Sequence, residues 1–160
     1  MAEDGVIIER PNRDKASSKA TRAIVVLLLL VSVVLMLIVT IGGWDVLEGA
    51  KPLQIGYIAV YLLVAFYVLR WNRGVLPVIA ALAIILLIFA AVAWPAWFDR
   101  DKAGFSQPGL NADVLGLVTL LIVPVQALLI VFAMQGFSQA WNVEVERRAD
   151  GSTRAVPQAG

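Results

Sequence analysis

The sequence predicts an all-α integral membrane protein, a bundle of four transmembrane helices with short cytoplasmic termini. Of its 160 residues, 60% are apolar and 16% are charged, whereas apolar residues make up about 45–50% of an ordinary soluble domain. Four long stretches contain no acidic or basic residue, and each approaches the roughly 20 helical residues that cross the hydrocarbon core of a bilayer. A soluble bundle would need a charged face on every helix, and these stretches have none.

Helix signals mark the ends of the four spans. Pro52 and Pro77 fall in first turns, where the missing N–H does no harm, and Asn111 and Asp113 are candidate caps before the last span. The predicted spans cover about 23–44, 52–70, 75–98 and 114–137. They form a transmembrane domain, 23–137, between a basic arm, 1–22, and a tail, 138–160. The first span is longer than the apolar core of a typical signal peptide, so we expect it to stay attached as an anchor.

Basic residues are distributed unevenly between the two sides of the membrane. The arm carries five, the connection after the second span carries Arg70 and Arg73, and the tail carries three, so one side has ten. The other side has Lys51, Arg100 and Lys102. Because flanks rich in Lys and Arg stay inside, we expect both termini to be cytoplasmic, in the cytoplasmic membrane of a bacterium.

Tryptophan marks the predicted membrane boundaries. An indole stands at or just beyond the end of every span, where its apolar ring and N–H donor suit the headgroup region. Stacking against a ligand is the alternative role, but the regular placement favours interfacial anchors. The predicted anchors are Trp44, Trp71, Trp94, Trp97 and Trp141.

Polar residues within the spans fall on single helical faces. Gln54, Tyr57 and Tyr61 are three and four residues apart, and Thr119 and Gln126 are seven apart, so each set lies along one face. We interpret these faces as packing seams, since polar side chains join helices in membranes. A polar cavity for a lipid headgroup or quinone is the alternative. Small side chains that allow close helix approach line the third span at Ala80, Ala83 and Ala90.

Pro124 and Gln126 stand out in the apolar fourth span. Pro124 cannot donate to the carbonyl of Leu120, so a kink is expected near the middle of this helix. Gln126 points to a different sector, and we expect it to reach a neighbouring helix or another protein, fixing the register of the bundle. The kink is interpreted as structural, with a gating hinge as the alternative.

Two short strands are expected outside the membrane. The segments GVIIER near the start and WNVEVER near the end both resemble strands, and the second alternates Trp141, Val143 and Val145 with polar residues. Both lie on the predicted cytoplasmic side, so they can pair as a two-stranded ribbon or add to the sheet of a partner. The extreme ends, 1–4 and 151–160, are expected to be flexible.

The composition excludes most catalytic chemistry. Histidine and cysteine are absent, which removes the usual ligands of haem, zinc, copper and iron–sulfur sites. No charged residue lies inside a span, so a proton-coupled carrier would lack the titratable group that it needs at membrane depth. The acidic residues of the loop 99–113 are a candidate cation site, but Arg100 and Lys102 among them favour a solvated loop.

Two functional classes remain. We expect a non-catalytic integral subunit or assembly partner of a larger membrane complex, with no enzyme activity and no cofactor. Its partners would be the lipid bilayer and another membrane protein or a second copy of the chain, and not nucleic acid. The alternative is a carrier or channel for a small neutral or lipidic molecule, lined by the polar faces of the second and fourth spans.

Overall fold

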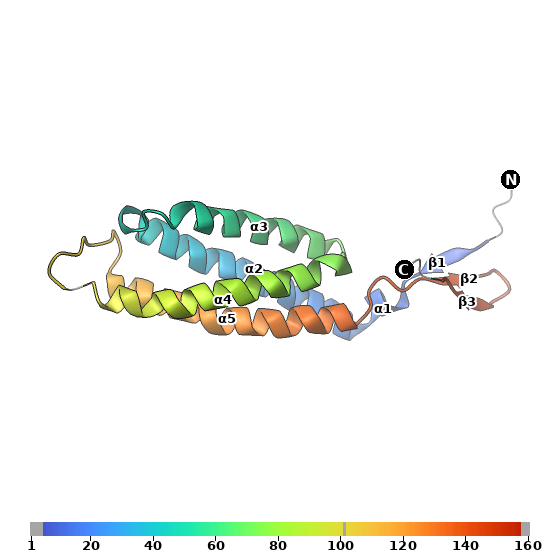
Figure 1. The fold of residues 1–160 in the computed structure, drawn as a ribbon. Helices are drawn as coiled ribbons and strands as arrows, with labels where there is room; N and C mark the ends of the chain where they lie inside the picture. The colour runs from blue at the N-terminus through green and yellow to red at the C-terminus, as the bar shows by residue number, and fades with distance from the viewer. Residues whose placement is uncertain (1–4, 101, 158–160) are drawn as a thin grey trace.

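The computed structural model describes residues 5–100 and 102–157, and it confirms the predicted class (Figure 1). Four long apolar helices, each long enough to cross a membrane, pack as a bundle. They are α2 (Ala16–Gly42), α3 (Lys51–Leu69), α4 (Leu76–Phe98) and α5 (Ala112–Ser138). The short helices are α1 (Pro11–Asp14), η1 (Trp44–Val46) and η2 (Arg73–Val75), and the strands are β1 (Ile7–Glu9), β2 (Val145–Arg147) and β3 (Thr153–Ala155).

The helix ends follow local signals as well as hydropathy. Helix α2 begins at Ala16, before the apolar stretch, because the residues from there to Arg22 are compatible with a helix although they are not apolar. Helix α5 begins after Asn111, whose side chain accepts hydrogen bonds from the backbone N–H groups of Asp113 and Val114. This is the N-cap geometry expected of asparagine.

Helices α4 and α5 form the most extensive contact in the bundle, and α2 packs against both α3 and α5. Small residues explain the close approach of α4 and α5. Ala80, Ala83 and Ala90 are buried in α4, and a side-chain carbon on Gly136 of α5 would lie only 3.1 Å from the side chain of Leu76. Helix α3 has few contacts with α4, so these two neighbours are loosely joined.

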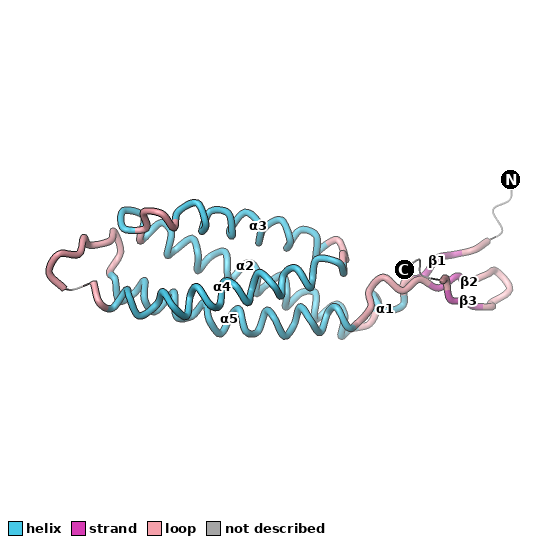
Figure 2. The backbone as a smooth tube through the Cα atoms, viewed as in Figure 1, coloured by secondary structure: helices cyan, strands magenta, loops and turns pink. Residues whose placement is uncertain are grey.

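A three-stranded antiparallel sheet of order β1-β2-β3 lies beyond one end of the bundle (Figure 2). Ile8 pairs with Glu146, and Glu146 pairs with Arg154. The predicted pairing of the two segments is therefore confirmed. The expectation of a flexible tail was wrong for Thr153–Ala155, which form the third strand. An Asp150-Gly151 turn, with Gly151 at φ 82°, returns the chain into β3.

The two ends of the bundle carry different parts of the chain. The terminal end carries residues 5–22 and 139–157 together with the connection from α3 to α4, and the loop end carries residues 43–50, 99–100 and 102–111. The two groups of basic residues counted in the sequence separate in the same way. The ten-residue group lies in the flanks of the terminal end.

Candidate functional site

A chain of neutral hydrogen bonds crosses the middle of the bundle. The hydroxyl of Tyr61 in α3 donates to Oε1 of Gln126 in α5 at 2.7 Å, and Nε2 of Gln126 donates to Oγ of Ser32 in α2 at 2.8 Å. Ser32 in turn donates to the carbonyl of Leu28 at 2.7 Å. The side chains of Tyr61, Gln126 and Ser32 are fully buried, so this polar seam joins three helices, and each of its buried polar atoms has at least one hydrogen-bond partner.

Ser32 was not singled out in the sequence, because a lone serine in an apolar run gives no periodic signal. Pro124 lies inside α5, which is continuous from Ala112 to Ser138. The kink remains a prediction. Gln126 sits two residues further along and bonds to neighbouring helices, so its amide serves helix packing.

An apolar cavity of about 400 Å³ lies toward the loop end, lined by residues of all four long helices. Gln54, Tyr57 and Thr119 contribute the polar side chains inside the bundle, and Arg100 stands at the loop end. Each of the first three is engaged already, since Gln54 accepts from Thr40, Tyr57 donates to a carbonyl of α4, and Thr119 donates to a carbonyl of its own helix.

The predicted polar cavity thus differs from what the structure contains. Tyr57 and Thr119 line the space, but Tyr61 and Gln126 do not. They lie deeper in the bundle and bond to each other. The lining is mainly aliphatic and aromatic, which suits an apolar ligand or part of one, and its size falls within the roughly 300–1,000 Å³ of small-molecule sites.

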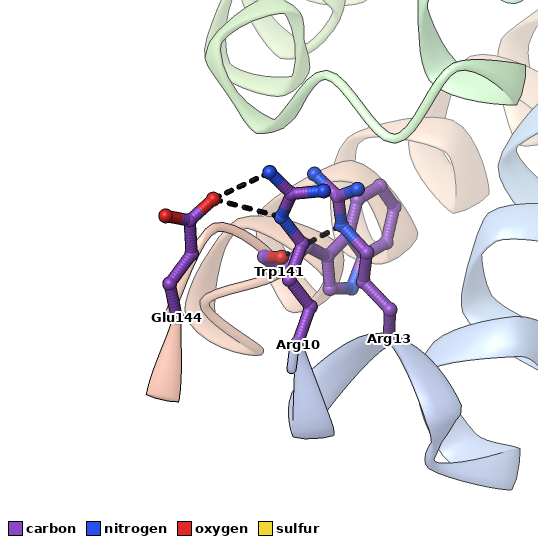
Figure 3. A network of polar contacts seen from close by, with 4 residues as sticks. All are labelled: Arg10, Arg13, Trp141 and Glu144. Atoms are coloured by element: carbon purple, nitrogen blue, oxygen red, sulfur yellow. Dashed lines mark hydrogen bonds and ion pairs between the residues drawn. The ribbon is translucent and has the colours of Figure 1, made fainter. Parts of the chain in front are cut away.

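The terminal end is held together by contacts between the N-terminal arm and the tail (Figure 3). Nε of Arg10 donates to Oε1 of Glu144 at 2.9 Å, and the two side chains form an ion pair. Nε of Arg13 donates to the carbonyl of Trp141 at 2.9 Å. Asn12 donates to the carbonyl of Ala140 at 3.0 Å. We call these contacts the terminal latch.

Trp141 is the apolar centre of this end. Its ring meets that of Trp71 edge to face, with centroids 5.3 Å apart, an arrangement that aromatic pairs prefer. Its Nε1 donates to Gln139 at 3.0 Å, and Gln139 donates to Thr21 at 3.0 Å, which ties the tail to α2. Arg73 adds a link to α5, because its Nε donates to the carbonyl of Phe137 at 2.7 Å.

The prediction that all five tryptophans are interfacial anchors was wrong for two of them. Trp141 is 0% exposed and Trp97 is 6% exposed, so both indoles pack inside the protein and do not face headgroups. Trp44 is exposed, and Trp71 and Trp94 are half-buried. Boundary position in the sequence says where an indole lies along the bundle axis, but not whether it faces outward.

The acidic residues of the loop end do not form a metal site in the part of the chain that the structure describes. Asp99 forms an exposed ion pair with Lys102 at 2.7 Å. Asp101 of the candidate cluster lies outside the described residues. Comparison of the chain with protein-family models, curated proteins and solved structures finds no match.

Proposed function

We propose that this protein is a non-catalytic integral subunit or assembly partner of a larger complex in the bacterial cytoplasmic membrane, and that it binds its partner through strand β1. In this proposal both termini, and the sheet, lie in the cytoplasm, because the ten basic residues of the terminal-end flanks favour that side. The observation that carries the proposal is a difference between the two edges of the sheet.

The β1 edge is the more apolar of the two, since only Glu9 at the end of β1 is charged and it is paired with Arg147. Val6, Ile7 and Ile8 are 42%, 62% and 57% exposed, and β1 is an edge strand. The opposite edge strand, β3, carries Thr153 and Arg154. Proteins protect edge strands with charged residues, because an exposed apolar edge pairs with other chains. Arg154 lies in the middle of β3, whereas the charge of β1 stands at its last residue and leaves Ile7 and Ile8 uncovered, so the β1 edge is the one suited to a partner.

The partner that fits the β1 edge is an extended polypeptide segment. The sheet lies beyond the end of the bundle rather than beside its apolar faces (Figure 1), so the isoleucines are placed away from the hydrocarbon core. A strand added to β1 would pair with its backbone and cover Ile7 and Ile8. The terminal latch ties the residues that follow β1 to the tail through Arg10 and Arg13, and this order before binding reduces the entropy lost on binding.

Quantitative co-purification tests the proposal. A C-terminally tagged chain, expressed from its own locus and extracted in gentle detergent, is expected to retain a partner at near one-to-one ratio by mass spectrometry. The double variant Ile7→Lys, Ile8→Lys places charges on the β1 edge and is expected to lower retention at least about tenfold, equivalent to roughly 1.4 kcal/mol.

The matched control puts the same charges on the other edge, as Thr153→Lys, Ala155→Lys. It is expected to retain the partner. Migration of the wild-type chain alone, or equal loss in both variants, would exclude docking through β1. Recovery of a second copy of the chain as the stoichiometric partner would replace the accessory subunit with a homo-oligomer.

The apolar cavity supports a second candidate, a carrier for a lipidic molecule. Gln54 and Tyr57 place the cavity beside the first half of α3, toward the loop end, while the seam at Tyr61 closes the packing beyond it. Passage would therefore require this seam to open. Because the chain has no native cysteine, single cysteines test this directly. If the protein is a carrier, thiol reagents are expected to reach cysteines at positions 57 and 119. They are also expected to reach cysteines at positions 61 and 126 when cargo is present. Protection of positions 61 and 126 under both conditions would exclude passage.

A further inference from the structure

We propose that a cleft at the terminal end, between the N-terminal arm and the end of α3, binds a phosphate group. The cleft has a volume of about 510 Å³, and Arg10, Arg13, Lys19 and Arg22 bring four cationic side chains to it. Asp14 is the one acidic side chain among the described residues that line it. Ile8 of β1 also lines the cleft. The inference still stands apart from the proposed function, because the cations that would bind the phosphate belong to the arm and to α2 and not to β1.

The fold brings these cations together from two helices. Lys19 and Arg22 are three residues apart near the start of α2, so they share one face. Arg13 belongs to the short helix α1, and Arg10 directly precedes it. The terminal latch holds α1 in place. The cations are thus fixed by backbone elements and by contacts with the tail.

Trp71 forms the floor on which two guanidinium groups meet. The Cζ atom of Arg22 lies 4.2 Å from the centre of the indole and that of Arg13 lies 5.9 Å from it. Trp71 follows the C-cap of α3 with φ 62°, and the N–H groups of Trp71 and Asn72 donate to the carbonyls of Val68 and Tyr67, the usual left-handed closure of a helix. The end of α3 therefore fixes the position of the indole beneath the two guanidinium groups.

The two arginines on this floor keep donors for a ligand. Arg22 uses Nη1 to donate to the carbonyl of Leu69 at 3.0 Å, and Arg13 uses Nε to donate to the carbonyl of Trp141. Each guanidinium has five N–H donors. Among the described residues neither Arg13, Lys19 nor Arg22 forms an ion pair, whereas Arg10 is paired with Glu144.

The charge balance favours an anion. Burial lowers the pKa of Arg13, and the neighbouring charge of Arg10 lowers it further, against the opposing effect of Glu144. An arginine remains protonated at neutral pH, so the convergence of like charges opposes the folded arrangement. A bound anion would relieve it. Guanidinium forks match the oxygens of a phosphate group in pairs, which makes phosphate a better ligand than a halide.

The position of the cleft suggests two sources for that phosphate. Arg22 directly precedes the apolar stretch of α2, and Trp71 directly follows α3 and Arg70, so the cleft lies at the level of lipid headgroups. Basic pockets at this level bind anionic headgroups. A soluble phosphate compound would present the same group from the water side. Both sources share the recognised chemistry, and the experiment separates them.

The test uses the full chain in nanodiscs of phosphatidylcholine, with or without added phosphatidic acid. The wild-type protein is expected to retain phosphatidic acid in native mass spectrometry. The variant Lys19→Gln, Arg22→Gln is expected to bind it more weakly, on the order of thirtyfold for two cations near an anionic group. The single variant Lys19→Gln, which changes an exposed side chain without an ion pair to any described residue, keeps the test valid if the double variant misfolds.

The control variant Lys15→Gln, Arg148→Gln removes two basic residues of the same end that do not line the cleft. It is expected to bind phosphatidic acid nearly as the wild type does. Inorganic phosphate, titrated into phosphatidylcholine nanodiscs and followed by tryptophan fluorescence, is the second arm. Saturable binding of both ligands assigns the phosphate group itself, and binding of the lipid alone assigns a headgroup site. Binding of neither, or equal weakening in both double variants, overturns the proposal.

Discussion

The two ends of the bundle are held together in different ways. At the terminal end, residues 134 positions apart in the chain form an ion pair, Arg10 with Glu144, and a fully buried tryptophan packs beneath them. At the loop end, the long connection from α4 to α5 is fastened to α2 by a backbone hydrogen bond from Leu110 to Gly42. Among the described residues its side-chain hydrogen bonds and ion pair are local, such as the exposed pair of Asp99 and Lys102, while the side chain of Leu110 packs against Gly42 of α2.

This difference indicates which end is organised for recognition. Exposed ion pairs contribute little at either end, up to about 1 kcal/mol, and the loop end is held mainly by the apolar packing of Trp97 with Val39 and Leu115 of neighbouring helices. The terminal end combines an aromatic centre, long-range polar contacts and a sheet, and both proposals concern it. A surface that is ordered before binding loses less entropy when a partner or ligand arrives.

The largest expected effect comes from removing the aromatic centre of the terminal end. Trp141→Ala is expected to lower the free energy of unfolding by about 3–5 kcal/mol, because it leaves a cavity beneath the latch. The change is also expected to loosen the attachment of the sheet to the bundle, measured as faster amide hydrogen exchange at Val145–Arg147. Trp141→Phe, which keeps a ring beside Trp71, is the control and should lose less. Unchanged protection of the sheet in Trp141→Ala would show that the latch does not depend on this indole.

At the loop end, a matched test is overpacking between α4 and α5. A side-chain carbon at Gly116 would lie 2.7 Å from Cε2 of Phe98 and 3.0 Å from Cβ of Trp97. Gly116→Val is therefore expected to destabilise by about 1–3 kcal/mol, measured by denaturant unfolding in detergent. The control is Gly56→Val, since a side-chain carbon there would meet no atom of another helix within 4 Å. If Gly116→Val also removed protection from the sheet, the two ends would be coupled and the contrast between them would fail.

The polar seam between the two ends gives a smaller effect. Gln126→Leu removes the hydrogen bonds to Tyr61 and Ser32, and the expected loss is about 0.6–2 kcal/mol, the value of such bonds between membrane helices. Tyr61→Phe and the double variant complete a cycle that isolates the coupling between the two residues. A coupling energy near zero would mean that apolar packing alone fixes the register of α3 and α5.

The helices could be predicted because they depend on local sequence, and the pairing of β1 with β2 because four spans return both strand-like segments to the same side of the membrane. Hydropathy located the four spans, and alternation in WNVEVER located the region of β2, although the strand itself begins only at Val145. Strand β3 was missed because its residues are polar and few. The Asp150-Gly151 turn was the signal that could have revealed it.

Which face of a helix is buried could not be predicted, because it depends on neighbours distant in the sequence. Trp97 and Trp141 occupy the boundary positions of lipid anchors, but each meets a residue of another helix or connection and is covered by it. The basic cleft was hidden for the same reason. The arm shows an ordinary run of basic residues, and only the return of α3 places Trp71 beneath Arg13 and Arg22.

The smallest expected effect concerns how far order extends into the hairpin of β2 and β3. Hydrogen bonds from the side chain and backbone of Ser152 lower the pKa of Asp150. A carboxyl group whose pKa is lower in the folded chain stabilises the turn when the pH is above the ordinary pKa of the group, about 3.9. That contribution disappears as the pH falls through the lowered pKa. The amide resonance of Ser152 should therefore shift with a midpoint below the ordinary value, and Asp150→Asn, which keeps an acceptor oxygen, should abolish the shift. A midpoint at or above the ordinary value would mean that the hairpin turn is open in solution, and the ordered part of the terminal end would then stop at the pairing of β1 with β2.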